Sequence, residues 1–146
     1  MAGYLVNTDH LLRSLFVHFM PGVTALPERD VDAIDRLPML IFTVGSGAAT
    51  GNGTVRQAQI RPVTFTLLAG PDGDDRSARE HAIDLGDELA EVVLERFPGA
   101  RVAGVGGIAR VTDAMSLPAL GASTVIAGRE VAQVNAAFEF IVQPPA

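Results

Sequence analysis

The chain has 146 residues, a formal net charge of −6, 11 basic residues that are all arginine, and neither cysteine nor tryptophan. This length predicts one domain over 1–146, large enough to bury a core without disulfides or a structural metal. The lack of cysteine excludes disulfides, thiolate metal sites and a cysteine nucleophile, and the acidic balance disfavours tight binding of nucleic-acid phosphates.

The apolar runs predict neither a membrane span nor a secretory signal. Glycine, proline or charge interrupts each run before the about 18 residues that a spanning helix needs. The first ten residues contain no basic start and no continuous apolar stretch. The mean hydropathy of +0.29 is high for a small soluble monomer, which indicates apolar surface buried between subunits.

The first periodic segment, 8–20, predicts an amphipathic helix. Its apolar residues form one stripe at helical spacing. Thr8 or Asp9 is expected to cap its start, and Pro21-Gly22 to end it.

The next segments predict a short helix or turn and then a long hairpin. The acidic segment 26–37 lies between prolines and has an apolar residue at every third position, which favours a short helix or turn. The branched and aromatic run 39–44 predicts a buried strand, and 62–69 alternates like a strand with one wetter face. The glycine-rich stretch 45–54 joins these two strands.

A second helix is predicted over 77–97. Ser77 and Glu80 match the S-x-x-E capping box, and apolar residues follow at helical spacing. Pro98-Gly99 is expected to end this helix.

The last third predicts a second hairpin. Segment 101–113 is typical of a strand with a glycine-rich bend, 114–123 of a loop, and 124–126 of a short strand. Strict apolar and polar alternation over 131–143 predicts a long strand. The order helix, hairpin, helix, hairpin favours an α+β fold, with an antiparallel or mixed sheet of about four to five strands and two main helices on one face.

No catalytic, cofactor or metal site is predicted, and the protein is not expected to be an enzyme. The glycine-rich stretches have the wrong spacing for a phosphate loop, and no lysine is present. His10 and His18 are too far apart on their helix to share a metal. His81, with Glu80 and Asp84 close in sequence, is expected to be solvated.

Dispersed arginines and acids, long loops and surplus apolar area indicate a protein that assembles with copies of itself. Arginine suits pairing between subunits because its fork binds carboxylates through two hydrogen bonds. Strand edges and the loops 45–58 and 113–129 are expected to make these contacts. The candidate interface residues are Gly45, Ser46, Gly47, Asn52, Gly53, Arg56, Arg61, Arg101, Arg110, Asp113, Arg129 and Glu130.

Short sequence segments also resemble those of a known family, across about residues 5 to 144. These segments are Asp9-x-Leu11-Leu12, Arg36-Leu37-Pro38, Val44-Gly45-Ser46-Gly47, the strand 63–66, the helix 78–97, Gly104-x-Gly106-Gly107-Ile108-Ala109-Arg110 and the strand 134–140. In this order of elements the chain resembles the tail terminator, or tail completion, proteins of long-tailed phages that infect high-GC bacteria.

The resemblance implies a virion protein, assembled in the host cytoplasm, that forms a hexameric ring at the head-proximal end of the tail. The ring ends polymerisation of the tail tube protein and contacts head-completion proteins, and double-stranded DNA passes through it without specific binding. Six spheres of about 38 Å, the size of such a domain, leave a hole about one sphere wide. The alternatives are another connector component (head-closure, tail-tube or minor tail protein), or a small α+β enzyme or ligand-binding domain.

Overall fold

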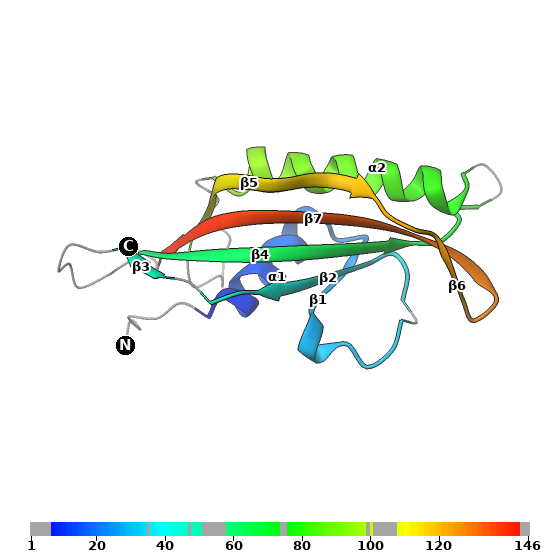
Figure 1. Ribbon diagram of the computed structural model, residues 1–146, viewed down its shortest axis with the longest axis horizontal. Coiled ribbons are helices and arrows are strands. Elements are labelled where there is room, and N and C mark those ends of the chain that lie inside the picture. The colour runs from blue at the N-terminus through cyan, green and yellow to red at the C-terminus, as the bar shows by residue number, and fades with distance from the viewer. Residues whose placement is uncertain are drawn as a thin grey trace.

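The computed structural model describes residues 7–34, 36–46, 48–50, 58–73, 76–98, 100 and 108–143. Two helices and seven strands follow one another along this part of the chain (Figure 1). In chain order the elements are α1 (Thr8–Phe19), β1 (Thr24–Pro27), the 3-10 turn η1 (Glu28–Asp30), β2 (Met39–Val44), β3 (Ala48–Thr50), β4 (Ala58–Ala69), α2 (Ala78–Glu91), the π-helical turn η2 (Val92–Arg96), β5 (Ile108–Leu120), β6 (Thr124–Ile126) and β7 (Arg129–Gln143).

The strands form one mixed sheet. Five of them follow the order β1-β2-β4-β7-β5, while β3 pairs with β4 and β6 with β7. The pair β1 and β2 is parallel and the other pairs are antiparallel. This confirms the predicted α+β class, with two short strands beyond the four to five expected.

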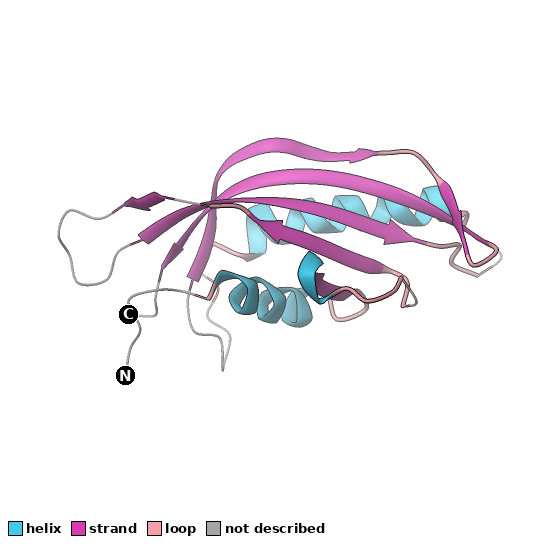
Figure 2. Ribbon diagram, turned by 60° about the horizontal axis from the view of Figure 1, so that its bottom comes forward, coloured by secondary structure: helices cyan, strands magenta, loops and turns pink. Residues whose placement is uncertain are grey.

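Both helices cover the same face of the sheet, as the sequence order predicted (Figure 2). Residues that are partners across the strands share a face. The row Phe42, Phe65 and Ala136 is buried beneath the helices, and the next row, Thr43, Thr64 and Ala137, lies on the opposite face. Thr43 and Thr64 are exposed there, so this second face is open to solvent along its middle.

The core is centred on phenylalanine. Six phenylalanines of the seven in the chain are almost completely buried. Phe16 of α1 lies with its ring centroid 5.6 Å from Phe65 of β4 and 5.1 Å from Phe97, which follows η2. Phe65 in turn contacts Phe138 and Phe140 of β7. These rings join both helices to the centre of the sheet.

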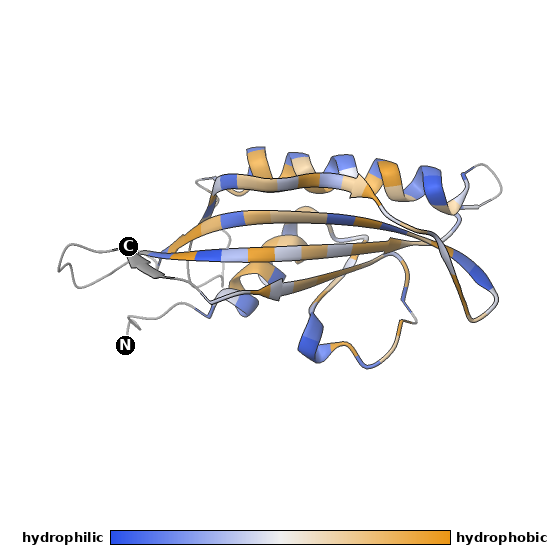
Figure 3. Ribbon diagram, viewed as in Figure 1, coloured by the Kyte–Doolittle hydropathy of each residue, from blue (hydrophilic) through white to orange (hydrophobic). Residues whose placement is uncertain are grey.

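The ends of the helices follow local capping rules. Asn7, and neither Thr8 nor Asp9, caps α1, because its Oδ1 accepts a hydrogen bond from the His10 amide at 3.2 Å. For α2 the predicted cap is confirmed, since Ser77 Oγ accepts from the Glu80 amide at 3.2 Å. Hydrophobic and hydrophilic stretches alternate along α2 (Figure 3), and the helix continues as η2 to residue 96.

Two predicted segments differ in the structure. The segment expected as a short helix or turn, 26–37, contributes the end of strand β1 and the short turn η1. The loop expected over 114–123 is wrong, because 114–120 continues β5. Register shifts between Val111 and Ala119 break the alternation of β5, so its sequence has no period of two. The predicted glycine-rich bend at Gly104, Gly106 and Gly107 lies outside the described residues.

Candidate functional site

The structure separates the predicted interface residues into three places. Gly45, Ser46 and Arg61 lie at one corner, where β2 ends and β4 runs beside it. Arg110 and Asp113 lie on β5, and Arg129 and Glu130 begin β7. The other five candidates, Gly47, Asn52, Gly53, Arg56 and Arg101, lie outside the described residues.

The corner is held by backbone and side-chain hydrogen bonds. The Gly45 amide donates to the Pro62 carbonyl at 2.7 Å, and Arg61 Nε donates to the Gly45 carbonyl at 2.9 Å. A Cβ added at Gly45 would lie 2.9 Å from Pro62 Cγ, so this close approach requires glycine. Arg61 therefore has a structural role at the corner in addition to any contact with a neighbour.

Strand β5 is an edge strand with exposed apolar side chains. Met115 is 56% exposed and Leu117 is 57% exposed. The segment 113–129, expected as a mobile contact loop, is instead mostly strand, with 113–120 in β5 and 124–126 in β6. Three register shifts and Pro118 interrupt the edge, which limits how many backbone groups a further strand could pair with.

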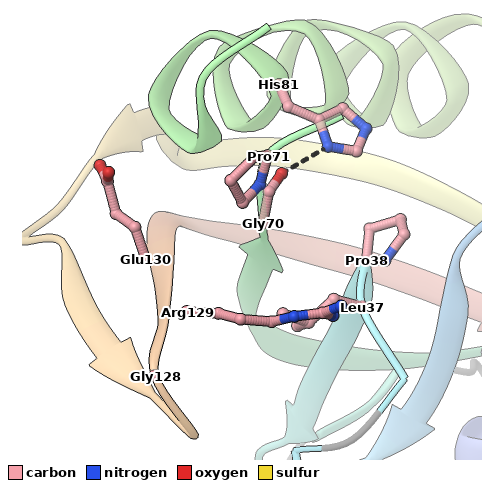
Figure 4. A pocket seen from close by; sticks show the side chains of 8 residues that line it. All are labelled: Leu37, Pro38, Gly70, Pro71, His81, Gly128, Arg129 and Glu130. Atoms are coloured by element: carbon pink, nitrogen blue, oxygen red, sulfur yellow. Dashed lines mark hydrogen bonds between the residues drawn. The ribbon is translucent and has the colours of Figure 1, made fainter. Parts of the chain in front are cut away.

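Arg129 and Glu130 lie beside a cavity of about 390 Å³ at the end of the sheet (Figure 4). His81 of α2 also lines it, and its Nδ1 lies 2.9 Å from the Gly70 carbonyl oxygen. The Arg129 side chain extends toward Leu37, whereas the Glu130 side chain points away from Leu37 (Figure 4).

The structure does not gather His81, Glu80 and Asp84 at this cavity. Asp84 Oδ2 accepts a hydrogen bond from Arg76 at 2.5 Å, and Ser77 Oγ lies 3.4 Å from Glu80 Oε1. Neither carboxylate lines the cavity.

Arg76 joins the turn before α2 to the first turns of that helix. It forms ion pairs with Asp72 and Asp84. The hydrogen bond and positive charge of Arg76 lower the pKa of Asp72 from its ordinary value of 3.8. The acidic turn before α2 is therefore paired, through Asp72, with the positive charge of Arg76.

The described part of the chain contains no group of three histidine, aspartate or glutamate side chains placed to hold a metal ion. Within the same residues, no helix is long and apolar enough to span a membrane.

Two features of the surface lie largely outside the predicted interface residues. One is the open sheet face, whose central side chains Thr64, Thr66 and Asn135 are polar and uncharged. The other is a cavity of about 380 Å³ at the start of α1, which is lined by Arg61, Arg29 and the first residues of the helix. The alternation of apolar and polar residues along β4 and β7 indicated that one face of the sheet is exposed to solvent. No local pattern in the sequence indicated the cavity.

Comparison with known proteins adds little to this description. No family model matches the chain, and no curated protein matches it. Fifteen chains of solved structures match, one of them with 12% identity and a TM-score of 0.41, covering 95% of this chain and 92% of the other. A score this low carries no argument about fold or function, so the function is argued from the chain itself.

Proposed function

We propose that the protein is a structural virion protein, without catalytic activity, that forms a ring at the head-proximal end of a phage tail tube. The ring ends tube polymerisation and joins the tail to head-completion proteins, and DNA passes through its lumen. The phage context comes from the resemblance of the sequence to tail terminator proteins. The structural observation that supports assembly is that β5 lies at an edge of the sheet and exposes apolar side chains.

The edge supports assembly because it exposes apolar side chains on a strand that, among the described residues, pairs with a neighbouring strand on one side only. Met115 and Leu117 are both more than half exposed on β5. An exposed apolar edge recruits another chain unless it is covered. The opposite edge of the sheet is β1. We propose that β5 of one copy contacts β1 of the next, so that the contact joins two unlike surfaces. Contacts between unlike surfaces close into rings when the rotation between copies allows it.

The open sheet face fits the passage of DNA. Its central rows contain threonine, asparagine, alanine and Ile41, with Glu139 toward one end and Arg110 in the row beyond Glu139. The central rows provide no cation to bind a phosphate, and tight DNA binding depends on several such cations. A surface of this kind lets a duplex pass without holding it.

The proposal is tested by adding the purified protein to tail tubes of a phage whose terminator the sequence resembles, and imaging the tube ends. We expect closed rings on tube ends and shorter tubes when the protein is present during polymerisation. Leu117→Glu should abolish both effects, because it places a charge in the apolar contact. Ile83→Glu is the matched control, since Ile83 is 42% exposed on α2, which belongs to neither edge of the sheet.

A folded protein that neither caps tubes nor associates with its own copies would overturn the proposal. Binding along the tube or at the head vertex would instead identify another connector component.

A further inference from the structure

A polar cavity of about 380 Å³ lies where the start of α1 meets η1 and the corner of the sheet. Five of its six lining residues are polar or charged, and Val44 is the exception. The full lining is Asn7, Thr8, Asp9, Val44, Arg29 and Arg61. Its volume is in the range of sites that hold small molecules.

The first turn of α1 presents amide groups there. Asn7 satisfies the amides of His10, through its side chain, and Leu11, through its carbonyl. Thr8 and Asp9 are the first two residues of α1, so their amides have no acceptor within the helix. Amides at a helix start and the positive end of the helix dipole favour an anion at this position.

Thr8 provides a second, independent observation. The residue is only 4% exposed, and its Oγ1 has no hydrogen-bond partner among the described residues. Such an unpaired buried hydroxyl is rare and costs free energy. Thr8 Oγ1 is the one buried side-chain polar atom in this condition across the described segments.

Two guanidinium groups complete the cavity. Arg61 uses Nε to bind the Gly45 carbonyl, and its two terminal nitrogens have no partner among the residues described. Arg29 forms an ion pair with Asp9 at 2.6 Å and lies 4.0 Å from Asp30. Asp9 is the opposing charge in the cavity, and Arg29 offsets it, which leaves Arg61 without a carboxylate partner among the described residues.

We propose that this cavity binds an oxyanion of a small molecule, either a phosphate or a carboxylate. Arg61 pairs with the anion, the amides of Thr8 and Asp9 donate to it, and the Thr8 hydroxyl gains its missing partner. The proposal is independent of the ring, because the cavity lies within one chain.

Entry of the anion requires a side chain to move, since Thr8 Oγ1 is shielded from solvent. Arg29 is suited to this movement because its side chain is 69% exposed and its described partners are the two carboxylates. We therefore expect Arg29 to keep one side of its guanidinium group on Asp9 and to turn the other side toward the anion, because the planar group donates several N–H hydrogen bonds.

Isothermal titration of the full chain at fixed ionic strength tests this. The probes are inorganic phosphate, acetate and a short DNA duplex. We expect saturable binding of phosphate or of acetate. The probe that binds shows whether the cavity takes a phosphate or a carboxylate. Thr8→Val should weaken it about tenfold, the size of one lost hydrogen bond to a charged group. Arg29→Gln should weaken it similarly, and Arg129→Gln, at the other cavity, should not.

A melting experiment without ligand separates a loss of binding from a loss of folding. Thr8→Val removes an unpaired buried hydroxyl, so it should melt at or above the temperature of the parent chain while losing its response to phosphate. Equal responses in the parent chain and Thr8→Val would overturn the proposal and assign the hydroxyl to water. Absence of saturable binding, or binding of the duplex alone, would also overturn it.

Discussion

At the scale of single residues, Gly45 tests how closely the two strands approach at the corner. Gly45→Ala should lower the free energy of unfolding by about 1–3 kcal/mol, because the new Cβ would lie 2.9 Å from Pro62 Cγ and 3.3 Å from the Pro62 carbonyl oxygen. Chemical denaturation measures this change. Gly22→Ala is the control, since a Cβ there meets nothing within 4 Å. Equal effects of the two substitutions would contradict the close approach.

The ion pair of Asp72 predicts a dependence of stability on pH. Arg76 lowers the pKa of Asp72 in the folded chain below its ordinary value of 3.8. The folded state therefore binds this proton less readily than the unfolded state, so the contribution is complete above the ordinary pKa and is lost as pH falls through the folded value. The effect should be small because the pair is exposed.

Melting curves of the parent chain and Asp72→Asn between pH 7 and pH 2 measure this contribution. The parent chain should melt higher at pH 7, and the difference should disappear in acid. Asp87→Asn is the control for removing a carboxylate, because Asp87 is exposed on α2 and forms no ion pair among the described residues. A difference between the parent chain and Asp72→Asn that persists in acid would assign the effect to something other than this titration.

At the scale of elements, the cap of α2 shows how far local sequence determines structure. Ser77→Ala should lower the free energy of unfolding by about 1 kcal/mol, because the Glu80 amide loses its acceptor. Ser123→Ala, in the exposed segment before β6, should change it by no more than a few tenths. Urea denaturation distinguishes the two, and a silent Ser77→Ala would mean that water replaces the cap.

The elements recognised from the sequence share a property: their signals are local. α1, α2 and β7 have an unbroken apolar period, and caps or prolines mark where the helices start and end. The second half of β5 was missed because its register shifts break the period. β1 was missed because four residues with Pro27 at the end are too few to show one.

At the scale of the whole molecule, the phenylalanine cluster holds the two layers together. Phe65→Ala should lower the free energy of unfolding by about 3–5 kcal/mol, because Phe65 contacts rings from α1, β2 and β7. Phe19→Ala, at the half-buried margin of the cluster, should cost clearly less. Guanidinium denaturation followed by circular dichroism measures both, and equal losses would contradict a core centred on Phe65.

The open face and the edge β5 also belong to this scale. Their side chains are ordinary threonines, asparagines and a few apolar residues in the sequence. They become candidate surfaces because both helices pack on the opposite face and no described strand lies beyond β5. A ring of the kind that tail terminators form would use surfaces of this kind, and the ring itself stays a prediction.

Local patterns along the chain were enough to predict the α+β class, the two helices and the strong strands, because periodicity and caps act over a few residues. The strand order, the parallel pair and the cavity at Arg61 became known only from the folded structure. These depend on pairings between distant segments, such as Gln59 with Val142, and no local pattern encodes which distant partner a strand finds. The cavity follows from the same cause, since Thr8, Arg29 and Arg61 meet only after the sheet has brought their elements together.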